Sequence, residues 1–134
     1  MRVFLDTNVL VSAYVARGLC ADLVRLVLSE HELIVGEVVL AELRRFLRER
    51  LRVPDDLCAQ VEQDLRAQSV VPRPPAPSSV ACRDPDDRWV LASAEHGAAD
   101  LLVTGDRDLL DVAKRSRVPI VSPRAAWERL RRPG

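Results

Sequence analysis

Four acidic side chains stand at positions where a folded chain could bring them into one site. Asp6 directly follows the apolar run 2–5, and Asp106 lies three residues beyond the apolar run 101–103. Each run is typical of a short buried strand, and the carboxyl ends of parallel strands meet at one edge of a sheet, where α/β proteins bind ligands. The two carboxylates are therefore expected to converge.

Asp87 and Glu42 complete the set, and each has a structural alternative. Asp87 falls in the first turn of a helix expected over residues 86–95, where an acid also caps the helix or favours its dipole. Glu42 falls at the margin of the apolar stripe of a helix expected over residues 37–51. From that margin it can reach a cleft beside the core or remain on a solvated rim.

Four carboxylates with no His or Cys among them form the ligand set of a hard divalent cation. Mg²⁺ and Mn²⁺ prefer oxygen ligands, whereas zinc takes nitrogen and sulfur as well. Such centres carry out phosphoryl or phosphodiester transfer, in which the metal activates water and offsets phosphate charge. No P-loop and no glycine-rich fingerprint follows the first strand, which argues against a nucleotide cofactor.

The charged residues are unevenly distributed along a chain whose net charge is zero. Twenty Lys and Arg residues balance twenty Asp and Glu residues, so the chain lacks the basic excess of a non-specific polyanion binder. Residues 84–111 nevertheless carry a net charge of −6, and residues 112–134 carry +6. Acids crowded in this way repel one another unless a cation compensates them.

The cysteines and the apolar segments bear on location. Cys20, Cys58 and Cys82 are an odd number at wide spacing and form neither a zinc motif nor a disulfide framework, which indicates a reduced, cytoplasmic protein. The uncharged run 7–16 is well short of the roughly 20 residues that a membrane span needs. We expect no association with a membrane.

Strands are expected to alternate with helices along the chain. Apolar runs predict further strands at 33–35, 70–71 and 119–121, and a proline-rich loop occupies 72–79. Helices are expected over residues 9–15, 21–28, 37–51, 54–68 (with Asp55 as its cap), 86–95, 108–114 and 123–130. This alternation is typical of a parallel sheet covered on both faces. It predicts an α/β fold: a single three-layer α/β/α domain over residues 1–134 with about five parallel strands.

The ordered motifs resemble those of PIN-domain ribonucleases, and within them VapC-type toxins of toxin–antitoxin operons. The matching blocks are the opening Val3–Leu10, the segment Val38–Leu43, the segment Asp84–Ala94 and the segment Leu102–Leu110. They occur in the family's order, and the resemblance runs from about residue 1 to 125. The proline-rich segment 72–79 departs from the family's pattern.

The resemblance implies a PIN-like fold and a metal-dependent endoribonuclease that acts on single-stranded RNA with Mg²⁺ or Mn²⁺. The catalytic and metal-binding acids would be Asp6, Glu42, Asp87 and Asp106. Asp108 is an alternative to Asp106 because both follow one strand, and Asp84 competes with Asp87. Thr7 and Asn8 would support Asp6.

The resemblance also implies partners. A cognate antitoxin is expected, as is a homodimer, for which Leu19, Leu23 and Leu57 offer apolar surface beyond the needs of one small core. Three arginines flank Glu42 on the predicted helix and could bind RNA phosphates or acids of a partner, with solvent exposure as the alternative. They are Arg44, Arg45 and Arg48.

Two other interpretations compete with a nuclease. A non-catalytic PIN-like binding module would need one of the four acids to be missing or misplaced. A phosphatase with an aspartyl nucleophile carries Asp-x-Asp after its first strand, whereas Asn8 stands at the second position here and removes the usual acid–base carboxylate.

Overall fold

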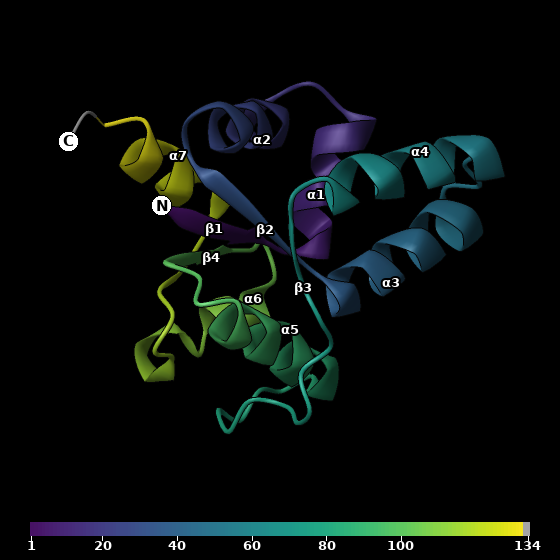
Figure 1. Ribbon diagram of the computed structural model, residues 1–134. Coiled ribbons are helices and arrows are strands. Elements are labelled where there is room, and N and C mark those ends of the chain that lie inside the picture. Colours follow the sequence, from purple (N-terminus) through teal and green to yellow (C-terminus); the bar gives the residue numbers. More distant parts are fainter. Residues whose placement is uncertain (133–134) are drawn as a thin grey trace.

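Five parallel strands form a central sheet in the computed structural model, which describes residues 1–132. The strands are β1 (Arg2–Leu5), β2 (Glu32–Gly36), β3 (Ser69–Val71), β4 (Leu101–Val103) and β5 (Ile120–Val121). Their order across the sheet is β3-β2-β1-β4-β5, so β1 lies at the centre (Figure 1). The register pairs Leu5 of β1 with Val103 of β4, which places the residues after both strands side by side.

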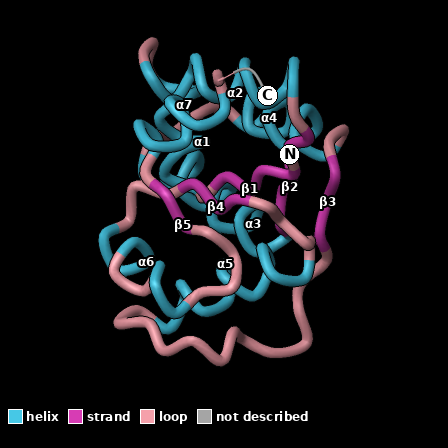
Figure 2. The backbone as a smooth tube through the Cα atoms, turned by 90° about the vertical axis from the view of Figure 1, so that its left-hand side faces the viewer, coloured by secondary structure: helices cyan, strands magenta, loops and turns pink. Residues whose placement is uncertain are grey.

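Helices cover both faces of this sheet. They are α1 (Thr7–Val15), α2 (Leu19–Glu30), α3 (Glu37–Arg45), α4 (Asp55–Arg66), α5 (Pro85–His96), α6 (Arg107–Leu110) and α7 (Pro123–Leu130). Helices α2 and α7 lie on one face, and α5 and α6 on the other (Figure 2). The predicted three-layer α/β arrangement with about five parallel strands is confirmed.

The central strands are buried on both faces, so each needs only a few apolar residues to cross the core. Val3, Phe4 and Leu5 are completely buried, as are all three residues of β4. Continuous apolar runs of this kind, without polar alternation, are what a parallel sheet under two helical layers requires. The buried strands give the residues that follow them a rigid support.

Polar residues directly after strands or loops begin several helices. Asp6 caps α1, Asp84 caps α5, Asp106 caps α6 and Ser122 caps α7, each through its side chain and a backbone N–H of the first turn. The expected cap of α4 is wrong. Pro54 occupies the cap position and Asp55 is the first helical residue, where its charge still favours the helix N-terminus.

Two predicted helices are interrupted. The helix expected over 37–51 ends as α3 at Arg45 and continues as a π-helical turn η1 (Phe46–Arg50), in which the N–H of Leu51 donates to the C=O of Phe46 at 3.1 Å. The helix expected over 108–114 is the short α6 followed by a 3₁₀ turn, η2 (Ala113–Arg115). Periodicity alone does not register such changes of helical pitch.

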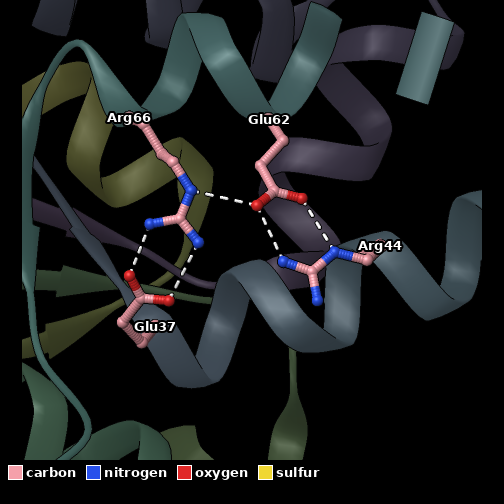
Figure 3. A network of polar contacts seen from close by, with 4 residues as sticks. All are labelled: Glu37, Arg44, Glu62 and Arg66. Atoms are coloured by element: carbon pink, nitrogen blue, oxygen red, sulfur yellow. Dashed lines mark hydrogen bonds and ion pairs between the residues drawn. The ribbon is translucent and has the colours of Figure 1, made fainter. Parts of the chain in front are cut away.

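A charged network joins α3 to α4 (Figure 3). The guanidinium of Arg44 donates from Nε and Nη2 to the two carboxylate oxygens of Glu62, at 2.8 and 2.7 Å. Arg66 donates from Nε to Glu62 at 2.9 Å and from Nη2 to Glu37 at 3.0 Å. The network therefore runs Arg44–Glu62–Arg66–Glu37 and holds the two helices side by side.

The apolar residues that were expected to offer surface to a second copy differ in their exposure. Leu23 is completely buried in the core and offers no surface to a partner, which corrects its place in the dimer argument, whereas Leu57 is 54% exposed. Within residues 1–132 no helix has the length and apolar character needed to cross a membrane.

Candidate metal centre

The predicted acids line one cavity at the carboxyl edge of the sheet. Its volume is about 370 Å³, and its walls include Asp6, Glu42, Asp87 and Asp106, with Asp84 and Asp86 beside them. The four side chains come from four separate segments: the end of β1, helix α3, the start of α5 and the loop after β4. The fold thus brings together every acid that the sequence analysis selected.

Asp6 is held by donors on both of its oxygens. Oδ1 accepts from the backbone N–H of Thr7 at 2.7 Å, and Oδ2 accepts from the Thr104 hydroxyl at 2.7 Å and from the Asn8 side-chain amide at 3.2 Å. The side chain is buried, so these bonds fix its orientation. The expected support by Asn8 is thus a direct hydrogen bond, and that by Thr7 comes from its backbone.

Thr104 is a site residue that sequence reasoning missed. Its buried hydroxyl donates to Asp6 and accepts from the backbone N–H of Asp106 at 2.9 Å, so it links the two strand ends. Asn8 makes a second link, because its Oδ1 accepts from the N–H of Gly105 at 2.8 Å. The sequence does place the Thr104 hydroxyl directly after the apolar run 101–103, and this could have indicated a site residue. Only the pairing of β1 with β4 shows which carboxylate that hydroxyl contacts.

Asp87 is not the cap of its helix. Asp84 performs that role by accepting from the N–H of Asp86 at 2.9 Å, which leaves Asp87 free to face the cavity. Asp87 is only 6% exposed, and no described residue donates to its buried Oδ2. A buried carboxylate oxygen without a donor carries a large desolvation cost, which a cation would relieve.

Asp108 lies close enough to join the acidic cluster. Asp87, Asp106 and Asp108 each place one carboxylate oxygen within 4.8 Å of the other two. Asp106 accepts from the N–H of Asp108 through Oδ1, and Arg83 lies 3.8 Å from Asp108 at an exposed position. In residues 1–132 no ion pair reaches the four predicted acids themselves.

Because no positively charged side chain of the described residues pairs with these acids, the pKa values of three of them are raised. Burial, followed by the charges of Asp6 and Asp86, raises the pKa of Glu42 from 4.5 to about 7. Burial and the neighbouring Asp106 raise the pKa of Asp87 to about 8. Burial also raises the pKa of Asp6, although its hydrogen bonds act in the opposite direction. Carboxylates crowded in this way hold protons near neutral pH unless a cation replaces them.

The three arginines beside Glu42 have different surroundings. Arg44 is bound by Glu62, and Arg48 lies 3.6 Å from Asp55, so both face α4 and line a separate depression. Arg45 is exposed at the end of α3, and its charge reaches the Glu42 carboxyl and lowers its pKa. Of the three, Arg45 is the one whose charge acts on an acid of the cavity.

Comparison with known proteins assigns the family. A sequence model described as PIN domain matches residues 2–108, which is most of the chain and includes all four acids. The chain belongs to the PIN domain family. No curated protein matches it in sequence.

Solved structures share the fold of this PIN domain. The crystal structure of VapBC2 from Rickettsia felis bound to a DNA fragment from their promoter matches with a TM-score of 0.60 and 17% identity, over 90% of this chain and 97% of the other. PAE2754 from Pyrobaculum aerophilum matches with a TM-score of 0.64 and 18% identity, over 97% of this chain and 89% of the other. At these identities the likeness concerns the fold.

The residues of the PIN domain site suit a hard divalent cation. Every candidate ligand is a carboxylate, and the buried Oδ2 of Asp87 has no donor among residues 1–132. Oxygen-only sets of this kind are typical of Mg²⁺ and Mn²⁺. The chemistry of the donors and their burial therefore both fit the metal that was predicted.

Proposed function

We propose that this PIN domain is a Mg²⁺- or Mn²⁺-dependent endoribonuclease that hydrolyses phosphodiester bonds of single-stranded RNA. The observation that carries the proposal is the convergence of Asp6, Glu42, Asp87 and Asp106 on one cavity, where no Lys, Arg or His of residues 1–132 forms an ion pair with them. Fixed carboxylates serve phosphodiester hydrolysis when a divalent ion is held between them and the phosphate. A binding module that does not cleave RNA would need one of the four acids to be missing or misplaced, and all four line the cavity.

The aspartates share one part in the proposed reaction, and Glu42 has a further one. Asp6, Asp87 and Asp106 would hold the cation, with Asp108 beside them. When bound, the cation would supply positive charge opposite the scissile phosphate and favour ionisation of a water. The donors on Asp6 orient its carboxylate for this role, since Thr104 and Asn8 connect it to both strand ends.

Glu42 is suited to proton transfer. It comes from α3, outside the cluster of three aspartates, and its carboxyl has a pKa of about 7. That value belongs to the site without a cation, and a bound cation would lower it and favour the ionised form of Glu42. The ionised carboxylate can accept a proton from an attacking water, and we assign Glu42 this role in addition to that of a ligand.

We further propose that the protein is the toxin of a toxin–antitoxin pair and forms a homodimer. The support is the shared fold with VapBC2 from Rickettsia felis and the exposed apolar side chains of Tyr14, Val15 and Leu57. If a small gene beside this one encodes the antitoxin, co-expression of the two should yield a stable complex that no longer cleaves RNA. Sedimentation should show a species twice the 15.0 kDa protomer, and a monomer alone at micromolar concentration would contradict the dimer.

Cleavage of a labelled single-stranded RNA tests the proposed activity. The protein should cleave in Mn²⁺ and stop when excess chelator is added. Glu42→Gln should lower the cleavage rate at least about tenfold, because general acid–base groups contribute about a hundredfold or more. Glu49→Gln, an exposed glutamate of η1, is the matched control and should cleave normally. Metal-independent cleavage, or equal rates for the two variants, would exclude the proposed mechanism.

A further inference from the structure

One aromatic ring lines the acidic cavity without belonging to the core. Phe46 forms part of the cavity wall together with Val11 of α1. It is only partly buried, and it is absent from the partly buried apolar side chains that pack against the core in the described residues, whereas Val11 and Trp89 are among them. Core packing therefore does not account for a phenylalanine at this position.

The helix carries the ring and an acid to the same cavity. Glu42 and Phe46 are four residues apart, so both side chains lie on one helical face, and both line the cavity. The π-helical turn begins at Phe46, while the next residue, Leu47, remains buried in the core. Short π-helical turns of this kind are frequent at functional sites.

The cavity wall combines two kinds of chemistry. Aspartates from α5 and from the loop after β4 supply carboxylates, and Val11 and Phe46 supply apolar surface. A nucleotide also combines a charged and an apolar part, because its phosphate binds cations whereas its base presents apolar faces. Arg50 lies over the Phe46 ring at 5.9 Å from its centroid, so a cation stands near the ring as well.

We propose that Phe46 is the stacking platform for an unpaired RNA base next to the scissile phosphate. The inference rests on the proposed ribonuclease function and deepens it. Base stacking on an aromatic side chain tolerates any base identity but requires that the base be free of a duplex. Phe46 therefore selects single-stranded RNA and positions its phosphate at the acids.

Binding to RNA with and without bases tests the stacking directly. The two probes are a short labelled oligoribonucleotide and an abasic ribose–phosphate chain of equal length and charge. The Kd of the protein for each probe is measured by anisotropy in the presence of Ca²⁺. Phe46→Leu should bind the intact RNA about tenfold more weakly and the abasic chain unchanged. Phe46→Trp should bind the intact RNA at least as tightly as the unmodified protein.

Controls separate stacking from damage to the site. Leu28→Ala removes an exposed apolar side chain of α2 and should leave both Kd values unchanged. Melting temperatures verify that each variant is folded. If Phe46→Leu weakens both probes equally or neither of them, the stacking role is excluded.

Cleavage in Mn²⁺, measured in parallel, keeps the two proposals distinguishable. If the unmodified protein binds RNA in a base-dependent way but does not cleave it, the proposed ribonuclease activity is refuted and the stacking role of Phe46 is retained. Cleavage with no difference between Phe46→Leu and the unmodified protein on intact RNA would refute the platform alone. Absence of RNA binding by the unmodified protein would overturn both.

Discussion

The carboxylates of the cavity differ in how their charge is compensated. Asp6 accepts three hydrogen bonds from Thr7, Asn8 and Thr104, so its ionised form is partly stabilised by the protein. Asp87 is as deeply buried, but one of its oxygens has no donor in the described part of the chain. The hydrogen bonds prepare Asp6 for a cation in advance, whereas the charge of Asp87 depends on the cation itself.

Asp87 makes the metal-free protein less stable as the pH rises. Its pKa is 3.8 in the unfolded chain and about 8 in the folded protein, so the folded state binds more protons between these values and stability falls as pH rises through that window. Asp87→Asn has no carboxyl at this position, so its stability should not fall with pH for this reason. In chelator, the variant should melt at least about 3 °C above the unmodified protein at pH 8, and the two should converge near pH 4.5.

Calorimetric melts across this pH range provide the measurement, and Asp111→Asn serves as the control because Asp111 is exposed outside the cavity. Glu42, with a pKa of about 7, contributes in the same direction over a narrower window. A variant that melts below the unmodified protein at pH 8 would show that Asp87 is compensated by a group of the protein.

Arg45 should contact RNA phosphates. It is exposed near Glu42, whereas Arg48 is close to Asp55 and faces α4. Arg45→Ala should weaken RNA binding about three- to tenfold and reduce the slope of log Kd against log salt by about one. Arg48→Ala is the control with equal charge loss. If the two variants change the salt slope equally, the effect comes from the net charge of the protein and not from a contact between Arg45 and an RNA phosphate.

At the scale of elements, the α3–α4 pair depends on Glu62. Its carboxylate accepts from Arg44 and Arg66, which lower its pKa from 4.5 to about 2. A lowered pKa stabilises the fold above pH 4.5, and that stability is lost as pH falls toward 2. Glu62→Gln should cost about 1 kcal/mol at pH 7, since the arginines are partly exposed, and lower the melting temperature by about 4 °C.

The same measurement at low pH checks the cause. At pH 2 the unmodified protein and Glu62→Gln should differ less than at pH 7, because half or more of the carboxylate is then protonated. Glu128→Gln, at an exposed position of α7, should match the unmodified protein at both values. If the melting temperature of Glu62→Gln is lowered by the same amount at both pH values, the variant has lost packing and not a charge interaction.

The elements themselves were largely predictable, because buried strands and capping residues have strong local signals. Apolar runs such as 2–5 and 101–103 became β1 and β4, and polar residues after them began helices. The order of the strands was not predictable, since no local pattern states which strands are neighbours. Thr104 was missed for that reason: its hydroxyl meets Asp6 only because β4 pairs with β1.

Phe46 was missed for another reason. Its position in the apolar stripe of residues 37–51 indicated a core residue, but the chain becomes π-helical there and the ring lines the cavity. Asp87 shows the opposite case. Capping and metal binding were both open to it, and the structure assigns the capping to Asp84 because that residue directly precedes the helix.

For the whole molecule, a bound cation should appear as added stability. The four acids come from segments spread from residue 6 to residue 106, so an ion held between them joins distant parts of the chain. Millimolar Mn²⁺ should raise the melting temperature at pH 8 by at least about 3 °C through mass action. Asp6→Asn should remove most of that rise, and Asp111→Asn should preserve it. An unchanged rise in Asp6→Asn would place the cation elsewhere.

The central claim is that this acidic cavity hydrolyses RNA, and single-turnover cleavage of a labelled single-stranded RNA in Mn²⁺ tests it most directly. Asp6→Asn retains the shape of the side chain but removes one charge from the best-supported acid. Its cleavage rate should fall at least about a hundredfold, the loss typical when one electrostatic stabiliser is removed, while Asp111→Asn cleaves normally. Cleavage by Asp6→Asn at the unmodified rate would contradict the account, because the activity would then belong to another site.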